Sequence, residues 1–501
     1  MTETTSNPTA ASPTIGAFTF VLHSHLPWVA HAGAWPVGEE WLHQAWATSY
    51  DPVFAMLERL AAEGRTGLVT LGVTPVVAAM LDDPYLLRQH HTWLGTWQTR
   101  AAGLATRPGT TQDLKDIARY EWRLASHALD RFETRWRHGG SPVLRGLRDS
   151  GVVEVLGGPA THPFQPLVAD DRLIDAQLRV GLDDAAIRLG ARPRGIWAPE
   201  CGYRPGLEDH YAQAGVTHFL ADGPTLLGSG ATTSAAHTVR DSEVVVVGRD
   251  LDVTYRVWSP RSGYPGGRWY RDFHTFDHGS GIRPARVTSA RTEPPDKRPY
   301  DPAAAAAATR QDAEDFVRVV VERLRHTPLT VVAYDTELFG HWWHEGPAWL
   351  EHVLRLLPEA GVRLATLGQL EPQGRVELQE GSWGSGKDFS VWAGVTDLLD
   401  ESRDVQRRLL DVVDKREPRA RDAALDQLAR EAFLVMSSDW AFCVTKDSAA
   451  EYARSRHATH RDRFYDLAHA IEGRHDERAR LLADRYRATD GPFGHLDART
   501  F

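Results

Sequence analysis

The sequence predicts an α/β protein built on a distorted seven-stranded parallel (β/α) barrel, with a helical insertion and a C-terminal all-helical domain. Short apolar runs typical of β-strands recur from the N-terminal region to Asp335, and amphipathic helical patterns separate several of them. After Val395 the patterns are helical only. Strands that alternate with helices indicate a parallel sheet, and seven such units favour a barrel over an open sheet.

The seven expected strands are short, and each is bounded by Gly, Pro or polar residues. They are residues 16–23, 67–77, 152–156, 195–200, 217–222, 251–258 and 329–335. Two of the intervening helices carry clear signals. Residues 171–189 repeat apolar side chains at helical spacing. Asp301 followed by Pro302 is typical of an N-cap and first helical position.

The same patterns predict the domain limits. Residues 1–13 are polar and lack Lys and Arg, so we expect a disordered leader rather than a signal peptide. The barrel is expected over 14–83 and 138–394, the helical insertion over 84–137, and the C-terminal helical domain over 395–501.

Composition limits the classes of partner. The chain has 501 residues, a net charge of −10 and only two cysteines. The negative charge argues against a nucleic-acid partner held by its phosphates, and so few cysteines suit a reducing, cytoplasmic compartment. No run approaches the roughly 20 apolar residues of a membrane helix. The 17 Trp favour a carbohydrate ligand, because indole rings stack on sugars. We expect a monomer or weak homodimer without a membrane partner.

Two of the expected strands end in carboxylates. Glu200 closes the run Trp197-Ala198-Pro199-Glu200, and Asp335 closes the seventh strand, with Glu337 two residues further on. The carboxyl ends of parallel strands are where barrel enzymes carry out chemistry. Two carboxylates there are the ingredients of glycoside hydrolysis. Glu337 shares a strand face with Asp335, which makes it a candidate supporting carboxylate.

Histidines gather at the same predicted rim. His23 and His25 are two residues apart on a strand, so both face one side. They are either a hydrogen-bonding pair in a polar pocket or half of a metal site. His162 follows the third strand and could bind substrate or cap a loop. Asp439 and Trp440 lie in the helical region, where we expect them to pack between helices.

Five short motifs occur in order and together resemble those of glycoside hydrolase family 57. They are His23-x-His25-x-Pro27, Gly151-Val152-Val153-Glu154-Val155, Trp197-x-Pro199-Glu200, the strand ending at Asp335 before His341-Trp342-Trp343, and Ser438-Asp439-Trp440. Within that family the chain looks like the 1,4-α-glucan branching enzymes, which supports an α-glucan as substrate.

The resemblance implies a retaining mechanism without a metal or another cofactor, in which Glu200 is the nucleophile and Asp335 the acid/base. Asp439, Trp440 and Glu337 would support these groups. The residues expected to bind the glucan are His23, His25, Trp28, His162, Trp197, Trp258, Tyr264, His341, Trp383 and Trp392.

One segment departs from the family pattern. Branching enzymes of the family carry a long loop after the fifth strand, with a Tyr at its tip that helps exclude water. Residues 223–250 are short here and contain no Tyr, so we expect more hydrolysis beside branching, unless Tyr264 replaces the missing residue. The alternatives are an α-amylase or 4-α-glucanotransferase of the same family, a metal-dependent deacetylase or α-mannosidase that uses His23 and His25, and a glucan-binding module without activity.

Overall fold

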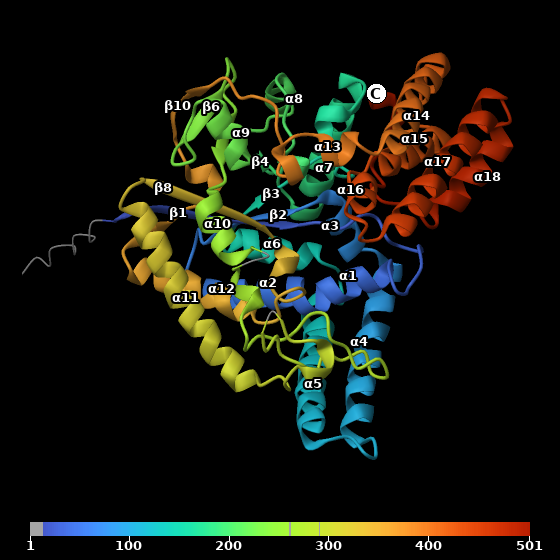
Figure 1. The fold of residues 1–501 in the computed structure, drawn as a ribbon. Coiled ribbons are helices and arrows are strands. Elements are labelled where there is room, and N and C mark those ends of the chain that lie inside the picture. Colours follow the sequence, from blue (N-terminus) through green and yellow to red (C-terminus); the bar gives the residue numbers. More distant parts are fainter. Residues whose placement is uncertain (1–13, 260–261, 290) are drawn as a thin grey trace, which may run out of the picture.

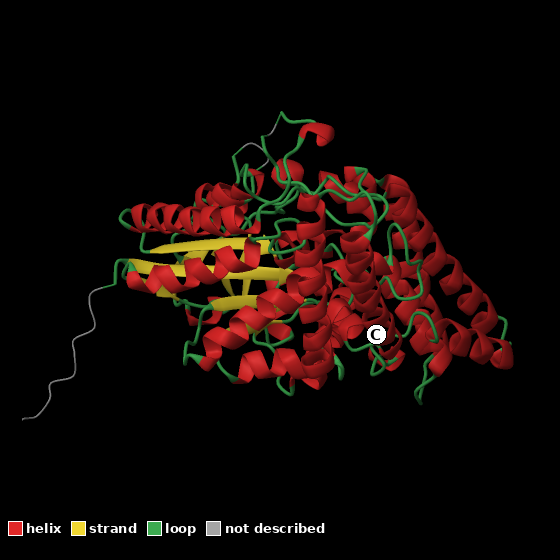
Figure 2. Cartoon of the chain, turned by 90° about the horizontal axis from the view of Figure 1, so that it is seen from below, coloured by secondary structure: helices red, strands yellow, loops and turns green. Residues whose placement is uncertain are grey.

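The computed structural model describes residues 14–259, 262–289 and 291–501. The leader predicted over residues 1–13 lies outside this described part. The described chain is an α/β fold in which helices cover both sides of the strands, with a group of helices at the C-terminal side (Figures 1 and 2).

The first sheet is parallel throughout. Its order is β3 (Val153–Leu156), β2 (Val69–Val73), β1 (Gly16–Ser24) and β8 (Leu329–Asp335), and β9 (Val362–Leu364) also pairs with β1. The strands β1, β2 and β8 are buried over almost their whole length. Continuous apolar runs of this kind are expected for parallel strands covered on both faces.

The second sheet is mixed. Its order is β10 (Pro372–Val376), β6 (Ala236–Val239), β7 (Val245–Gly248), β5 (His218–Ala221) and β4 (Gly195–Ile196), and only the β6–β7 pair is antiparallel. A parallel bridge between Gly157 and Ile196 joins the two sheets on one side. On the other side the Asp250 N–H, just beyond β7, donates to the Val331 carbonyl at 2.7 Å.

The expected strand at 251–258 is wrong, because Leu251–Val257 forms helix α10. The Asp250 side chain caps this helix by accepting from the Val253 N–H at 3.1 Å. Val253 and Val257, one helical turn apart, are both buried. The alternation of Val, Thr and Tyr suggested a strand, but the cap and the buried face select a helix. The strand of this region is β7, just before it.

Other expected strands are present with shorter limits. The second becomes β2, and residues from Pro75 onward form α3 (Pro75–Leu81). The fourth is reduced to Gly195–Ile196, because a 3-10 turn over Pro199–Cys201 follows. The seventh matches β8 at both ends.

Long helices lie between and beside the sheets. The pattern at 171–189 is confirmed as α7 (Asp171–Leu189), and Asp301 caps α11 (Pro302–Leu324) by accepting from two backbone N–H groups. The helices α4 (Pro84–Thr106) and α5 (Gln112–Arg131) form a hairpin that projects from the sheets (Figure 1). The remaining helices of this part are α1 (Glu39–Ala45), α2 (Asp51–Ala62), α6 (Ser141–Asp149), α8 (Leu207–Gln213), α9 (Gly223–Gly228), α12 (Gly346–Glu359) and α13 (Ser390–Ala393).

The C-terminal helices surround one buried helix. The helices are α14 (Thr396–Arg416), α15 (Ala423–Val435), α16 (Asp439–Lys446), α17 (Ala450–Glu472) and α18 (Asp476–Arg487). Every residue of α15 after Ala423 is buried, as expected for the central helix of a bundle. No helix among the described residues is both long and apolar enough to cross a membrane.

Candidate active site

Glu200 lies on a strained turn directly after β4. Its φ of 59° and ψ of 21° are in the left-handed region, and Cys201 follows with a φ of 49°. A residue other than Gly in this region costs about 1–2 kcal/mol, and such strain is concentrated at functional sites. The turn is held in place because the Trp383 N–H donates to the Glu200 carbonyl at 2.9 Å.

Both oxygens of the Glu200 carboxylate accept hydrogen bonds. The indole N–H of Trp383 donates to Oε2 at 2.7 Å, and the hydroxyl of Ser438 donates to Oε1 at 2.9 Å. The glutamate is only 8% exposed. The two donors fix its direction and stabilise the ionised form.

Asp335 and Glu337 lie at the end of β8. Asp335 pairs in register with His23 of β1, and its carboxylate receives no hydrogen bond from the described residues. Glu337 accepts from the Tyr50 hydroxyl and, at 3.2 Å, from the His25 backbone N–H. The two carboxyl groups therefore differ. Glu337 accepts two hydrogen bonds from the protein, whereas the Asp335 carboxylate accepts none from the described residues.

Burial raises the pKa of all three carboxyl groups. The pKa of Asp335 rises to about 6, although the charges of Arg249 and His25 lower it. The pKa of Glu200 rises to about 7 against the opposing hydrogen bonds from Trp383 and Ser438. The pKa of Glu337 reaches about 8, because the charge of Asp335 adds to burial. The site can therefore hold a proton near neutral pH, as an acid/base reaction requires.

The three predicted histidines form a stack on Trp197. His23 lies on the Trp197 ring with 4.2 Å between centroids, and His162 lies on His25 with 3.7 Å between centroids. His162 has a φ of 56°, a second strained residue at the site.

The histidines differ in their polar contacts. Both ring nitrogens of His23 are buried without a hydrogen-bond partner among the described residues. His162 Nδ1 lies 3.0 Å from the Ser438 hydroxyl. His25 Nδ1 lies 3.0 Å from the Thr74 hydroxyl, and its Nε2 lies 2.9 Å from Asp439 Oδ2. Burial lowers the pKa of His23 and His162 well below the usual value. Burial also lowers the pKa of His25, but the Asp439 carboxylate outweighs it and the pKa is raised.

The start of α16 and the two residues before it therefore contribute to the site. The interpretation of Asp439 as a helix-packing residue is wrong, because its carboxylate contacts His25 and also accepts from the Ser437 hydroxyl at 2.5 Å. Its expected role in supporting the catalytic groups stays a prediction. Trp440 is buried and donates to the Leu434 carbonyl at 2.8 Å, as a packing residue would.

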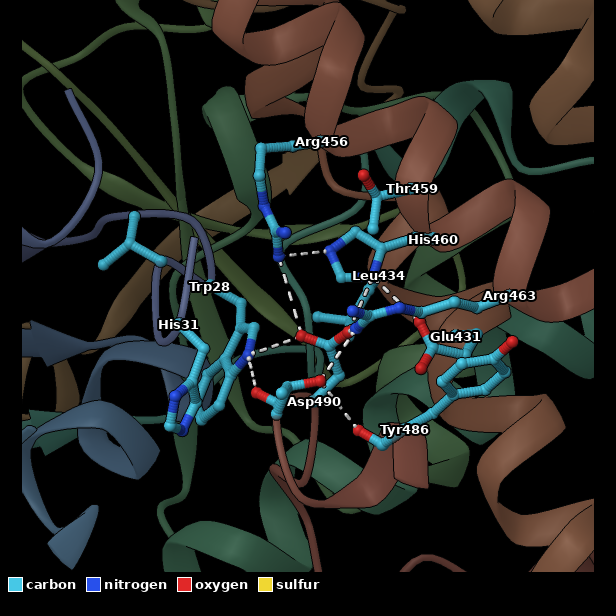
Figure 3. Close-up of polar contacts among 12 residues, drawn as sticks. Trp28, His31, Glu431, Leu434, Arg456, Thr459, His460, Arg463, Tyr486 and Asp490 are labelled. Carbon is cyan, nitrogen blue, oxygen red and sulfur yellow. Dashed lines mark hydrogen bonds and ion pairs between the residues drawn. The ribbon is translucent and has the colours of Figure 1, made fainter. Parts of the chain in front are cut away.

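Trp28 is not placed to stack on a sugar. It is 3% exposed, and its indole N–H donates to Asp490 at 3.1 Å, within a buried network that contains Arg456, Arg463 and His460 (Figure 3). Trp28 instead fastens the segment after β1 to the C-terminal helices, which corrects its expected role.

Two other predicted tryptophans are buried. The Trp197 ring stacks on His23, and the Trp392 ring stacks on Phe164 with 4.1 Å between ring centroids. Trp383 is half-buried beside Glu200.

The side chains of the remaining predicted residues contact groups other than the three carboxylates. The Tyr264 hydroxyl donates to Asp315 at 2.7 Å and its ring is buried, so it does not replace a lid tyrosine. Trp258 is 47% exposed and stacks on Trp342 with 5.7 Å between ring centroids. His341 is buried against Phe273.

Several residues at the site were missed by sequence reasoning. Tyr50 and Thr74 come from segments without a recognisable motif, and Ser438 was noted only as part of its motif. Arg249 pairs with Asp222 at 2.7 Å, lies 5.3 Å from the Trp383 ring centroid and lowers the pKa of Asp335. A correctly placed sixth strand would have indicated Arg249, since it directly follows β7.

Within the described part of the chain, two groups of side chains bring metal-binding atoms together. In the first, ligand atoms of His25, His162 and Asp439 lie within 4.8 Å of one another. The two imidazoles stack with an interplanar angle of 22°, so their lone pairs run side by side rather than converge on an ion about 2.0–2.1 Å away. The His23 ring is stacked between Trp197 and His162. This stacking is equally unsuited to the binding of one ion by both His23 and His25.

The second group, Glu431, His460 and Asp490, is fully buried in the helical bundle. Arg456 lies 2.8 Å from the Nε2 of His460, and Arg463 is ion-paired with Asp490 (Figure 3). These guanidinium groups already supply the positive charge that a metal ion would bring.

Comparisons with known proteins cover nearly the whole chain. Residues 19–377 match the family described as glycosyl hydrolase family 57, and residues 401–501 match the family described as 1,4-alpha-glucan branching enzyme, C-terminal. A "Probable 1,4-alpha-glucan branching enzyme" of Mycobacterium tuberculosis is 50% identical over 524 aligned residues, which cover 98% of this chain and 99% of that protein.

Solved structures with the same fold have more than one described activity. The GH57-type branching enzyme of Pyrococcus horikoshii superimposes with a TM-score of 0.91 at 30% identity, over 97% of this chain and 96% of that one. The α-amylase AmyC of Thermotoga maritima superimposes with a TM-score of 0.86 at 27% identity, over 97% of this chain and 98% of that one.

Proposed function

Because this chain belongs to glycosyl hydrolase family 57, we propose that it is a retaining 1,4-α-glucan branching enzyme with Glu200 as nucleophile and Asp335 as acid/base. The single observation that carries the assignment is the contrast between the two carboxylates. Glu200 is held on a strained turn by two hydrogen-bond donors, and the partly exposed carboxyl group of Asp335 receives no hydrogen bond from the described residues. The first arrangement fixes the direction of an attacking oxygen, and the second leaves a carboxyl group free to exchange a proton with the substrate.

In the first half of the reaction, a carboxylate oxygen of Glu200 attacks the anomeric carbon of an α-1,4-linked glucose. The bond from that carbon to the glycosidic oxygen breaks, and the departing oxygen takes its proton from Asp335. The product is a covalent glycosyl-enzyme, as in other retaining enzymes.

In the second half, Asp335 acts as a base. It takes the proton of an acceptor hydroxyl, whose oxygen attacks the anomeric carbon and displaces Glu200. A 6-hydroxyl of another glucan gives an α-1,6 branch, a 4-hydroxyl gives disproportionation, and water gives hydrolysis. The outcome therefore depends on which acceptor reaches the intermediate.

We assign direct sugar contact to the partly exposed members of the site, which are His25, Asp335, Trp383 and Asp439. The pair His25–Asp439 can both donate to and accept from a sugar hydroxyl. His23, His162 and Trp197 are buried and form the wall behind these residues. Ser438 lies between His162 and Glu200 and orients the nucleophile.

We further propose that β1, β2, β3, β4, β5, β7 and β8 form the seven strands of an incomplete barrel. The Gly157–Ile196 bridge and the Asp250–Val331 hydrogen bond support this, because they connect the two sheets on both sides. The proposed catalytic part remains residues 14–83 and 138–394, with 84–137 as the insertion and 395–501 as the helical domain.

Hydrolysis as a side reaction is supported by the segment after β5. Residues 223–250 fold into α9 and the paired strands β6 and β7. Tyr264 is tied to Asp315 and does not serve as a substitute lid. The similarity to an α-amylase of the same fold favours amylase activity as the second candidate function.

The assignment is tested with isosteric variants. Glu200→Gln and Asp335→Asn should each lower kcat on amylose by about 10³-fold or more, with an unchanged melting temperature. Glu337→Gln is the matched comparison. Because burial and the charge of Asp335 raise the pKa of Glu337 to about 8, its carboxyl is protonated at pH 7 and the amide should cost far less activity. Near-normal turnover in either of the first two variants would contradict the assignment.

A further inference from the structure

A second concave site lies outside the catalytic centre. It is a cavity of about 390 Å³ between the hairpin α4–α5, the helices α1 and α2, and the segments around residues 271–283 and 340–351. In Figure 1 the hairpin extends below the sheets, beside the yellow-green loops that follow α10. Ligand pockets in proteins have volumes of about 300–1,000 Å³, so this cavity is large enough to hold a small molecule or a chain segment.

Aromatic rings line the cavity on several sides. They are Trp93 and Trp97 on α4, Tyr120 on α5, Phe273 and Phe276 in the loop, and Trp342 after the catalytic strand. Trp35 adds an exposed ring at the rim. Several flat apolar faces around one space are suited to the C–H faces of sugar rings.

The polar groups of the lining hold these rings in fixed positions. The indole N–H of Trp93 donates to Glu40 at 2.7 Å, and that of Trp97 donates to Glu121 at 2.8 Å. Tyr120 is 3.0 Å from His344. A preorganised lining loses little conformational entropy when a ligand binds.

The charges of the lining are balanced, which argues against an ionic ligand. Arg271 pairs with Glu121, and Arg131 pairs with Asp51 at 2.7 Å. Arg283 lies over the Phe273 and Phe276 rings at 4.5 Å. His341 is nine-tenths buried, lines the cavity, and its Nδ1 has no hydrogen-bond partner among the described residues. Neutral hydroxyl groups match such a set of fixed donors and acceptors better than a phosphate or a carboxylate.

The cavity shares a wall with the catalytic centre. The backbone N–H groups of His341 and Trp342 both donate to the Glu337 carbonyl at 3.2 Å. On the other side, Ala47 and Thr48 line the cavity, while Tyr50 of the same helical turn donates to the Glu337 carboxyl. A chain bound in the cavity would therefore lie directly behind the residues that carry Glu337.

From these observations we infer that the cavity binds a segment of α-glucan and so holds the polymer at a second point. The inference rests on the proposed function for the identity of the sugar. The aromatic lining, the fixed polar groups and the balanced charge are independent of the catalytic residues.

The test uses maltoheptaose and hydrogen–deuterium exchange on the full chain carrying Glu200→Gln, which prevents turnover. We expect maltoheptaose to protect backbone amides in α4, α5 and residues 271–283, in addition to those near Trp383. Trp93→Ala and Phe276→Ala should weaken the affinity measured at these segments by about tenfold, which corresponds to about 1.4 kcal/mol.

The control is Trp122→Ala, on α5 but outside the cavity lining, with its ring 44% exposed. It should bind as tightly as the parent. Phe276 is 38% exposed, so its variant should fold even if Trp93→Ala does not.

The results separate the two proposals. Protection near Trp383 alone, or equal affinity in Phe276→Ala and Trp122→Ala, would overturn the cavity site and leave the catalytic assignment intact. Protection of the cavity segments together with wild-type turnover by Glu200→Gln would support the cavity and contradict the nucleophile.

Discussion

The roles proposed for Glu200 and Asp335 differ because the neighbours of the two carboxyl groups differ. Trp383 and Ser438 donate to Glu200, and the same Ser438 hydroxyl lies within hydrogen-bond distance of His162. The backbone strain at Glu200 is tolerated because these contacts and the Trp383 N–H fix the turn from several directions.

The pH dependence of kcat/KM follows from the two raised pKa values. Activity should fall on the acid side as Glu200 takes up a proton, and on the alkaline side as Asp335 loses its proton. Since the pKa values are about 7 for Glu200 and about 6 for Asp335, the maximum should lie between about pH 6 and pH 7. The curve has the same shape whichever carboxyl carries the proton in the free enzyme. A rate that keeps rising up to pH 9 would contradict this pairing.

Removal of metal ions should leave the reaction unchanged. Both ring nitrogens of His25 are within hydrogen-bond distance of protein groups, Thr74 and Asp439, and the ring is stacked on His162. These contacts hold the ring in place without a metal ion. We expect wild-type rates after overnight treatment with EDTA and gel filtration, measured on amylose. Lost activity that Zn²⁺ restores would instead favour a metal-dependent hydrolase.

The sequence predicted the site residues that lie at the ends of expected strands. It did not predict those that reach the site from other segments of the chain. Glu200 and Asp335 could be found because each closes an apolar run. Tyr50, Thr74 and Arg249 could not, since their contacts depend on how separate elements pack. Trp28 was placed in the glucan site because of its motif, whereas packing of the C-terminal helices buries it.

Among the elements, α16 and the residues before it have the most direct effect on the site. Ser438 and Asp439 come from this segment, so the C-terminal helices complete the catalytic centre. The helix limits were predictable from apolar spacing, as α7 shows. The segment at 251–258 was not, because a short run of Val, Thr and Tyr fits a strand or a helix until tertiary contacts decide.

The network around Asp490 should control how firmly these elements are joined (Figure 3). Asp490→Ala removes one of the two acceptors of the Trp28 indole N–H and the partner of Arg463, and the Asp490 side chain itself is buried. Breaking a buried ion pair typically costs about 3–5 kcal/mol, so we expect a loss of that order in the free energy of unfolding, measured with urea.

The control for this variant is Asp476→Ala. Asp476 also pairs with an arginine, Arg416, but its side chain is 67% exposed, and such pairs contribute about 0–1 kcal/mol. Equal stabilities of the two variants would show that the Asp490 network does not hold Trp28 in place.

In the whole molecule, three parts of the chain contribute to the proposed reaction. The strands supply Glu200 and Asp335, the C-terminal helices supply Ser438 and Asp439, and the α4–α5 hairpin forms one side of the inferred glucan cavity. The fold class and the helical parts could be predicted from periodicity. The pairing of strands into two sheets could not, because β6, β9 and β10 are short and lack a distinctive pattern, and the valine run that forms β7 was not recognised as a strand.

The balance between transfer and hydrolysis depends on the whole molecule, because it is set by how well the assembled site excludes water. Residues 223–250 form α9, β6 and β7 and provide no Tyr to cover the intermediate. We expect new reducing ends beside new branches, in a higher proportion than in relatives with a long loop, when both are incubated with amylose under the same conditions.

The measurement that tests the central claim most directly is the number of reducing ends in amylose products before and after enzymatic debranching. Wild-type protein should give a count that rises on debranching, because α-1,6 linkages have formed, and Glu200→Gln should give neither branches nor new ends. If the wild-type count before debranching increases and does not rise further afterwards, the protein hydrolyses without branching and the proposed function is contradicted.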